Sequence, residues 1–584
     1  MSIKTANEQK GAPVCWLCEH ESRLWAHTPE KKHGAVASQV QASLLQTKRR
    51  DHSRSLGAML QSVVVFGLIF SYAASSIIVT TTEGCLRGKS HRTLEKDVQV
   101  FLGIPYARPP TGELRFQKPQ PPSTWDEVYD ATRAKDSCMQ TLFPRLFDVP
   151  TGLSEDCLYL NVWTPLASER SELPILVWLH GGAFTAGSAY EARYDGSALA
   201  ALNDVVVVSC NYRLSTMGYL YANHTAAPGN LAMWDQLLAL QWVQRNIRFF
   251  GGDPDRVTIF GESSGGMMAH GHILSPHSRG LFRRVFLMSG TMSSDSCLDS
   301  ASDTIAKTNI ISTAVGCASK DLAVDPVQVL GCLRNQPAEK LCTVKAVKFR
   351  PTFETEFIPC LPSYASEQGY FNEVEAMVSV TAKEGPFGFL FQTSDKVLQD
   401  DLSSFEKEEL RALVEGVLRV LLRDSVIPLA MNYLKDAPLD DMIALRERAA
   451  EFLGNYLFYC PARRFAETYS TKGTEVYAMV FAHRSKKSQQ PEWFGTTHME
   501  ELPFVFGIPF SDPTNYTDED REFSAYVMKS LAEFARTGKP VLPDGNEWPA
   551  FSSERPDFLW LQPGNYSWAK NFSATACDVL RKPS

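Results

Sequence analysis

The stretch FGGDPDRVTIFGESSGG, residues 250–266, decides the fold that we expect for this chain. Its apolar run Val257–Phe260 is rich in β-branched and aromatic residues, which is typical of a buried strand. The run leads directly into Gly261–Gly265, after which a helical pattern begins. A strand that turns sharply into a helix around G-x-S-x-G lifts the serine above the sheet, because the glycines leave space where a Cβ would collide. Ser263 is therefore the candidate nucleophile.

Other apolar runs carry the same signature of buried strands. They are Pro174–His180, Asp204–Ser209, Arg284–Met288, Ala376–Val380 and Glu475–Val480. Helical spacing marks Leu231–Asn246, and Ser403 with Glu406 forms a capping box ahead of a second helix. Strands that alternate with helices predict an α/β fold, with a large, mostly parallel sheet covered by helices on both faces. The more helical region 300–470 is expected to form a lid over the carboxyl edge of the sheet.

A second glycine-rich turn, HGGAF at residues 180–184, follows the strand that ends at Leu179. Glycines allow backbone N–H groups to converge on one point, which a developing oxyanion requires. We expect Gly181 and Gly182 to form an oxyanion hole together with the backbone N–H of Ser264. The alternative is an ordinary glycine turn after a strand.

The apolar segment GAMLQSVVVFGLIFSYAASSIIV, residues 57–79, indicates the compartment of the chain. The basic residues that precede it are Lys48, Arg49, Arg50 and Arg54. This arrangement is typical of a signal peptide, and the segment is also about long enough to span a bilayer as a signal-anchor. The remainder of the chain is then extracellular, either secreted or tethered as a type II membrane protein through residues 57–79.

These features divide the chain into three parts. Residues 1–58 are polar and form a disordered or cytosolic tail, unless translation truly begins at Met59. Residues 59–80 are the signal peptide or anchor. No linker, repeat or charge block interrupts the part from residue 84 to residue 584, which we therefore treat as one domain.

Other features of the sequence agree with export. Candidate glycosylation sites in N-x-S/T sequons are Asn223, Asn515, Asn565 and Asn571. The formal net charge is −8 and no long basic run is present, so nucleic acid is not expected as a partner. Cys15 and Cys18 form a lone C-x-x-C without the second pair of a zinc site, and we expect neither a metal nor a cofactor.

Several long motifs resemble the type-B carboxylesterase and cholinesterase family. Residues 250–265 resemble the nucleophile signature of that family, and EDCLYLNVWTP at residues 155–165 resembles its second signature. Further matches are FLGIPYARPP at 101–110, LRF at 114–116, NYR at 211–213 and GNLAMWDQ at 229–236. The resemblance covers about Gly84 to Cys577. It implies an α/β-hydrolase fold and a serine carboxylic-ester hydrolase that uses serine, glutamate and histidine in that chain order.

The resemblance also implies the acid of the site. In the family the acid follows a buried strand in a lysine–acid–glycine turn, which corresponds here to TAKEG at residues 381–385. Glu384 is therefore the expected acid, whereas the rivals Asp395 and Glu375 do not directly follow a strand. Ser289 resembles a family serine that lies close to the acid.

The base is implied by GTTHMEELPFVFG at residues 495–507, which resembles the histidine loop of the family. His498 is the expected base, with His483 as the runner-up. His498 would take the proton of Ser263 and later protonate the leaving alkoxide, while the acid would hold the imidazole tautomer. Glu262 is expected to tune the electric field beside the nucleophile.

By resemblance, the disulfides are Cys138–Cys157, Cys317–Cys332 and Cys460–Cys577. The cysteines left over are Cys85, Cys210, Cys297, Cys342 and Cys360, and we expect the last two to pair. True cholinesterases carry, in the first of these loops, a tryptophan that binds quaternary ammonium through its π face. The loop of this chain is shorter and has no tryptophan.

The composition of that loop favours particular substrates. Phe147 or Phe143 is expected to line a gorge above the nucleophile, and Arg145 would repel a cation if it faced inward. We therefore expect the small-molecule substrate to be a neutral or lipophilic ester, and not a choline ester. Two alternatives stay open: a non-catalytic adhesion protein on the same fold, and a hydrolase of amides or thioesters.

Overall fold

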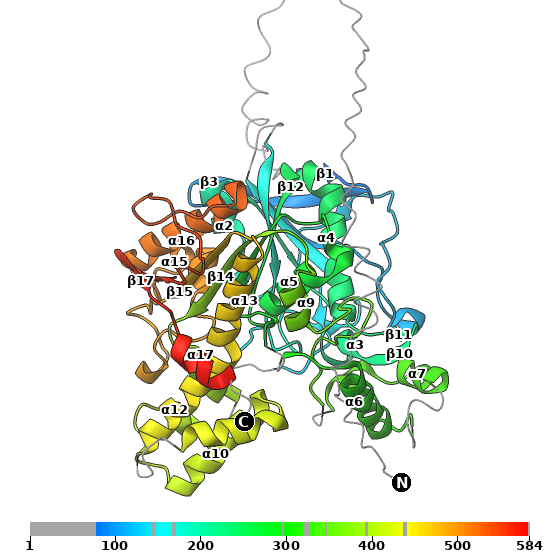
Figure 1. Ribbon diagram of the computed structural model, residues 1–584. Helices are drawn as coiled ribbons and strands as arrows, with labels where there is room; N and C mark the ends of the chain where they lie inside the picture. Colours follow the sequence, from blue (N-terminus) through cyan, green and yellow to red (C-terminus); the bar gives the residue numbers. More distant parts are fainter. Residues whose placement is uncertain are drawn as a thin grey trace, which may run out of the picture.

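The computed structural model describes residues 77–142, 146–165, 171–294, 297–318, 326–344, 347–391, 395–435 and 441–581. At its centre lies a sheet of 13 described strands in the order β1-β2-β3-β7-β9-β8-β12-β13-β14-β15-β16-β17, with β4 beside β2 (Figure 1). The strands are β1 (Ile77–Thr80), β2 (Cys85–Thr93), β3 (Lys96–Pro105), β4 (Tyr129–Asp130), β7 (Tyr159–Pro165), β8 (Leu173–Leu179), β9 (Val206–Cys210), β12 (Gly252–Glu262), β13 (Arg284–Met288), β14 (Glu375–Thr381), β15 (Val476–Phe481), β16 (Phe558–Gln562) and β17 (Asn565–Ala569). Two short ribbons pair β5 (Ser137–Cys138) with β6 (Leu153–Ser154), and β10 (Tyr221–His224) with β11 (Ala227–Pro228).

The middle of the sheet is parallel. From β9 through β8, β12, β13, β14 and β15 to β16, each neighbouring pair runs in the same direction. The edge strands β1, β2, β3 and β7 pair antiparallel on one side, and β17 pairs antiparallel on the other. All six strands expected from apolar runs are present, so the prediction of a mostly parallel sheet is confirmed.

Helices cover both faces of this sheet (Figure 1). The helices are α2 (Ser197–Asn203), α3 (Ser215–Tyr219), α4 (Leu231–Asn246), α5 (Ser264–Leu274), α6 (Ala301–Ala314), α7 (Pro326–Arg334), α8 (Ala338–Cys342), α9 (Pro362–Gln368), α10 (Lys407–Leu421), α11 (Ile427–Leu434), α12 (Met442–Gly454), α13 (Cys460–Thr471), α14 (Leu502–Phe506), α15 (Ile508–Ser511), α16 (Asp518–Thr537) and α17 (Ala574–Arg581). The predicted helix Leu231–Asn246 is confirmed with the same bounds.

Alternate residues of the strands serve two separate cores, as the period of two requires. In β8, Ile175, Val177 and Leu179 face the core that also contains α4 and α5, whereas Leu176 and Trp178 face the core formed with α2, α14 and α16. All five side chains are fully buried. Burial of apolar surface on both faces explains why these strands read as continuous apolar runs.

The region 300–470 is helical, as expected, and α6, α7, α10 and α12 gather at the end of the molecule opposite β1 and β3 (Figure 1). The predicted capping box of the α10 region is wrong. The helix begins at Lys407 with Glu406 as its N-cap residue. Ser403 instead donates its hydroxyl to Asp401, 2.6 Å away, because a short side chain in a turn can bond to a nearby carboxylate as readily as to a helix end.

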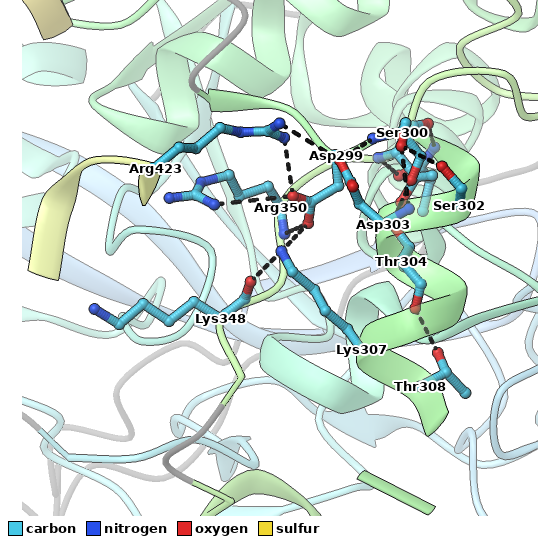
Figure 2. Close-up of polar contacts among 12 residues, drawn as sticks. Asp299, Ser300, Ser302, Asp303, Thr304, Lys307, Thr308, Lys348, Arg350 and Arg423 are labelled. Carbon is cyan, nitrogen blue, oxygen red and sulfur yellow. Dashed lines mark hydrogen bonds and ion pairs between the residues drawn. The ribbon is translucent and has the colours of Figure 1, made fainter. Parts of the chain in front are cut away.

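One buried carboxylate ties this helical region together (Figure 2). Asp299 accepts hydrogen bonds from Lys307 of α6 at 2.5 Å, from the backbone N–H of Arg350 at 3.0 Å and from Arg423 at 3.1 Å. Its side chain is 2% exposed. Three segments that are remote in sequence therefore share one ionic contact.

The folded part begins earlier than the expected boundary at residue 84. Ile77–Thr80 pair antiparallel with the start of β2, so the last residues of the predicted signal or anchor segment form a strand of the sheet. Residues 1–76, which include the apolar core of that segment, lie outside the described residues. Among the described helices, none is both long and apolar enough to cross a membrane.

Disulfides join Cys138 to Cys157, Cys317 to Cys332 and Cys460 to Cys577, the three pairs that the resemblance implies. The expected pair Cys342–Cys360 is wrong, because Cys342 is a buried free thiol at the end of α8 whereas Cys360 belongs to a different disulfide. Cys85 and Cys210 are also free thiols.

Two ion pairs explain why four family motifs contain charged residues. Arg115 of the LRF motif binds Glu155 of the EDCLYLNVWTP motif, with Nε 2.7 Å from Oε1. Arg213 of the NYR motif binds Asp235 of the GNLAMWDQ motif through two hydrogen bonds, at 2.6 and 2.8 Å. Buried charges are tolerated only when they are paired. The charged residue of each motif therefore requires the oppositely charged residue of the motif that it contacts.

Asp299→Asn should destabilise the protein by about 3–5 kcal/mol, because the cations that Asp299 binds lose the charge that balances them in a buried site. The free energy of unfolding, measured by chemical denaturation, reports this loss. Glu415→Gln is the matched control, since it removes an exposed ion pair with Arg419 of α10 and should cost less than about 0.5 kcal/mol. Equal effects of the two substitutions would contradict a structural role for Asp299.

Candidate active site

Ser263 lies at the sharp turn between β12 and α5. Its backbone has φ 57° and ψ −125°, a conformation that non-glycine residues rarely adopt and that is retained where the surrounding structure enforces it. The backbone N–H of Ser263 donates to the carbonyl of Met288 at 2.8 Å, and its carbonyl accepts from the N–H of Met267 at 3.0 Å. The turn is therefore held by β13 on one side and by α5 on the other.

The glycines beside Ser263 are required by close backbone contacts. A Cβ on Gly265 would lie 2.1 Å from the carbonyl oxygen of Leu179 at the end of β8. A Cβ on Gly261 would lie 2.5 Å from the carbonyl carbon of Gly265. The G-x-S-x-G turn thus packs directly against the strand that leads into the HGGAF turn, and the two glycine-rich turns are neighbours.

Glu384 and His498 are brought together from separate strands. Glu384 follows β14 and is fully buried, and its Oε2 lies 2.7 Å from Nδ1 of His498. The other carboxylate oxygen accepts from the backbone N–H of Thr381 at 2.8 Å and from the hydroxyl of Ser289 at 2.5 Å. With three partners, the carboxylate has one fixed orientation, and it fixes the imidazole in turn.

The second ring nitrogen of His498 faces the residue before Ser263. Nε2 lies 2.9 Å from Oε1 of Glu262, which is also buried. That oxygen makes no aligned hydrogen bond in the described part of the chain, so the contact is one of charge and proximity. No hydrogen bond among the described residues joins the Ser263 hydroxyl to His498, although such bonds are often long in the absence of substrate.

Aromatic rings and charges surround the imidazole. The rings of Phe387 and Phe458 lie 4.4 and 4.6 Å from that of His498, centroid to centroid. Burial alone would lower the pKa of His498, but the charges of Glu262 and Glu384 outweigh burial and raise this pKa well above its ordinary value.

The three N–H groups expected to form the oxyanion hole, those of Gly181, Gly182 and Ser264, donate none of the hydrogen bonds found among the described residues. Nδ1 of His180 lies 2.8 Å from the carbonyl oxygen of Gly181, and its ring stacks on that of Tyr212. Burial lowers the pKa of His180 to about 4, so its ring is neutral and Nδ1 donates to that carbonyl.

A model described as the carboxylesterase family matches residues 75–580. The chain is 32% identical over 534 residues to an acetylcholinesterase of Leptinotarsa decemlineata, covering 86% of this chain and 85% of the relative. It is 33% identical over 536 residues to a cholinesterase of Mus musculus, covering 88% and 87%. It is 34% identical over 545 residues to acetylcholinesterase-1 of Trittame loki, covering 90% and 97%.

The chain belongs to the carboxylesterase family. The central sheet with helices on both faces is accordingly the α/β-hydrolase fold, and this carboxylesterase is a serine hydrolase of carboxylic esters.

The rival residues of this carboxylesterase lie elsewhere. Glu375 begins β14, at the opposite end of the strand from Glu384, and pairs with Arg284 at 2.5 Å. Asp395 lies in an exposed position of a short 3-10 helix. His483 is bonded to Asp520 at the start of α16, with Nε2 2.6 Å from Oδ1.

Glu501 is a member of the site that the sequence analysis missed. This buried residue lies three positions after His498, and its carboxyl is 3.5 Å from the hydroxyl of Ser289. Burial, together with the nearby charges of Glu262 and Glu384, raises the pKa of Glu501 well above its ordinary value. A carboxyl residue in the otherwise apolar run ELPFVFG was the signal that could have identified it.

The remaining predicted residues are placed as follows. Phe147 is buried against Leu146 and Ala186, whereas Phe143 and Arg145 lie outside the described residues. The asparagines of all four sequons are exposed. Within the described residues, no group of three or more His, Cys, Asp or Glu side chains is arranged to hold a metal ion.

Glu262→Gln should move the acid limb of the pH profile to lower pH. His498 acts as a base only after it loses its proton, so kcat/KM rises with pH as the imidazolium deprotonates. Removal of the Glu262 charge lowers the pKa of His498 and moves that rise downward. Measurement of kcat/KM against pH for a neutral ester tests this expectation.

Glu501→Gln is the control for that experiment. The raised pKa of Glu501 favours its neutral form, which a neutral amide replaces, so the acid limb should move less than in Glu262→Gln. If the acid limb of the pH profile moves in the Glu501 variant and not in the Glu262 variant, Glu262 is not the carboxylate whose charge raises the pKa of His498.

Proposed function

We propose that Ser263, His498 and Glu384 are the catalytic triad of this carboxylesterase. The observation that carries the proposal is the bond of Glu384 to His498, 2.7 Å long, beside the strained turn that exposes Ser263. The other ring nitrogen of His498 contacts Glu262, the chain neighbour of Ser263, which supports placing the imidazole beside the serine.

The reaction follows from these positions. His498 takes the hydroxyl proton as Ser263 Oγ forms a bond with the ester carbonyl carbon, whose oxygen becomes an oxyanion. The free N–H groups of Gly181, Gly182 and Ser264 support the assignment of the oxyanion hole. Collapse of the intermediate breaks the bond to the alcohol, which leaves with the proton from His498. Water then repeats the sequence on the acyl-enzyme and releases the acid.

We further propose that the substrates are neutral or lipophilic esters. The loop closed by Cys138 and Cys157 has no tryptophan to bind an ammonium group. Glu191 is paired with Arg193, and Glu262 with His498. Arg193 therefore balances the charge of Glu191, which offers no unpaired charge to a cationic substrate.

The relatives named as cholinesterases favour a second candidate, the hydrolysis of choline esters. Amides and thioesters pass through the same acyl-enzyme and are further candidates at this site. We place the reaction outside the cytosol, because three disulfides and four exposed sequons fit an oxidising, glycosylating route.

Ser263→Ala should lower kcat by at least about 10⁴-fold with little loss of stability, since nucleophile loss removes the acyl-enzyme route. Turnover of a neutral ester and labelling by a fluorophosphonate measure the effect. Ser264→Ala is the matched control, because it keeps the backbone N–H of the oxyanion hole and should retain labelling. Activity of the Ser263 variant above about a hundredth of wild type would refute the assignment.

The preference for neutral esters can be tested with an isosteric pair, acetylcholine and 3,3-dimethylbutyl acetate, in which carbon replaces the ammonium nitrogen. We expect kcat/KM for the neutral ester to equal or exceed that for the choline ester, because the loop closed by Cys138 and Cys157 has no tryptophan to bind the cation. A preference of about tenfold or more for acetylcholine, equivalent to about 1.4 kcal/mol, would establish the second candidate instead.

A further inference from the structure

A small apolar cluster borders the candidate active site. Its buried members are Leu146, Phe147 and Ala186, and the partly buried side chains packed against them are Val149, Leu390, Phe391 and Met499. Most of these come from segments that carry site residues. Ala186 donates its N–H to the carbonyl of Gly182 at 3.0 Å, and Met499 directly follows His498. Phe391 packs edge-on against Phe387, which itself contacts the ring of His498.

Met499 has an unusual backbone conformation. Its φ is 72°, in the left-handed region that glycine occupies without cost and that a long side chain avoids. A residue in this conformation typically costs about 1–3 kcal/mol and persists where the surroundings enforce it, most often at functional sites. The backbone is therefore strained at the position that follows the candidate base, and the side chain at that position is a thioether.

Arg193 clamps the cluster from the side. Its Nη2 donates to the carbonyl of Leu146 at 2.6 Å and to Oε2 of Glu191 at 2.6 Å. Nη1 lies 3.9 Å from the sulfur of Met499, and the guanidinium lies 6.0 Å over the ring of Phe147. Because the Glu191 side chain is 1% exposed, its position is fixed, and Arg193 in turn holds the loop at Leu146 against the turn after His498.

The chemistry of the proposed reaction assigns a role to this arrangement. His498 must deliver its proton to the leaving alkoxide, so groups that adjoin His498 face the alcohol part of an ester. We propose that Met499, clamped by Arg193 against Phe147, is a specificity-determining residue whose side chain contacts the alcohol group, and that the enzyme selects esters of large apolar alcohols. This inference rests on the proposed triad and names the substrate class of that site.

The thioether suits such a contact. Methionine is flexible and polarizable and makes favourable contacts with aromatic and irregular apolar groups. Leu390 and Phe391 continue the same apolar surface, and Arg193 contributes no free charge because Glu191 balances it. An aromatic or long alkyl alcohol therefore finds apolar contact on this side, whereas methanol is too small to reach it.

The test compares two ester series in Met499→Gly. For acetate esters with methyl, hexyl and benzyl alcohols, we expect the ratio of kcat/KM for benzyl over methyl to fall about tenfold, as loss of an apolar contact does. For methyl esters of acids of increasing length, the corresponding ratio should change less than about twofold, because kcat/KM reports acylation and the acyl group lies away from Met499. An unchanged or increased benzyl-to-methyl ratio would overturn the inference.

Three further variants make the outcome decisive. Met499→Leu keeps an apolar side chain and should keep most of the benzyl preference. Leu94→Gly removes an exposed apolar side chain at φ 49° in the turn between β2 and β3, and it should alter neither ratio. Phe147→Ala combined with Met499→Gly should lower the ratio by less than the product of the single effects, because both side chains belong to one surface.

Active-site titration with a fluorophosphonate separates this inference from the proposed function. Wild-type protein that fails to label at Ser263 and hydrolyses no ester refutes the triad itself. Protein that labels stoichiometrically in every variant, with the same alcohol selectivity throughout, refutes only the role of Met499.

Discussion

The site depends on a balance of buried charge. Glu262, Glu384 and Glu501 are all buried around one imidazole, and three carboxylates together there would repel one another strongly in a medium of low dielectric constant. The protein meets this constraint in two ways. The charges of Glu262 and Glu384 raise the pKa of His498, which favours an imidazolium between them, and burial beside the same charges raises the pKa of Glu501, which favours its neutral form. Hydrogen bonds from Ser289 and Thr381 solvate the charge that remains on Glu384.

The topology of the sheet brings the residues of the candidate site together at one edge. Parallel strands end at the same edge of a sheet, and the turns that follow β8, β12, β13 and β14 carry the glycine pair, the serine, Ser289 and Glu384 respectively. Backbone strain gathers at the same edge. Ser263, Ser289 and Met499 all have positive φ, a concentration that is typical of functional sites whose geometry the surrounding structure enforces.

The features that could be predicted from the sequence are those that depend on local residue patterns and on motifs. Buried strands were recognised from β-branched runs, and α4 from its apolar spacing, because both depend on neighbours in sequence. The start of α10 could not be predicted, since Ser403 had an equally near partner in Asp401. The free thiol of Cys342 and the position of Glu501 depend on contacts between segments far apart in the chain, which no local pattern encodes. The contact of His498 with Glu262 was likewise unforeseen, because it depends on a rotamer.

The last strand of the sheet has a consequence for the behaviour of the protein in solution. β17 has no strand partner on its outer side among the described residues, so its backbone is open to pairing with another chain. Asn565 begins this strand and Asn571 lies two residues beyond its end, and both are exposed. A bulky, hydrated glycan at either asparagine would obstruct the approach of a second edge. Sugar attachment at these positions would then guard the protein against edge-to-edge aggregation.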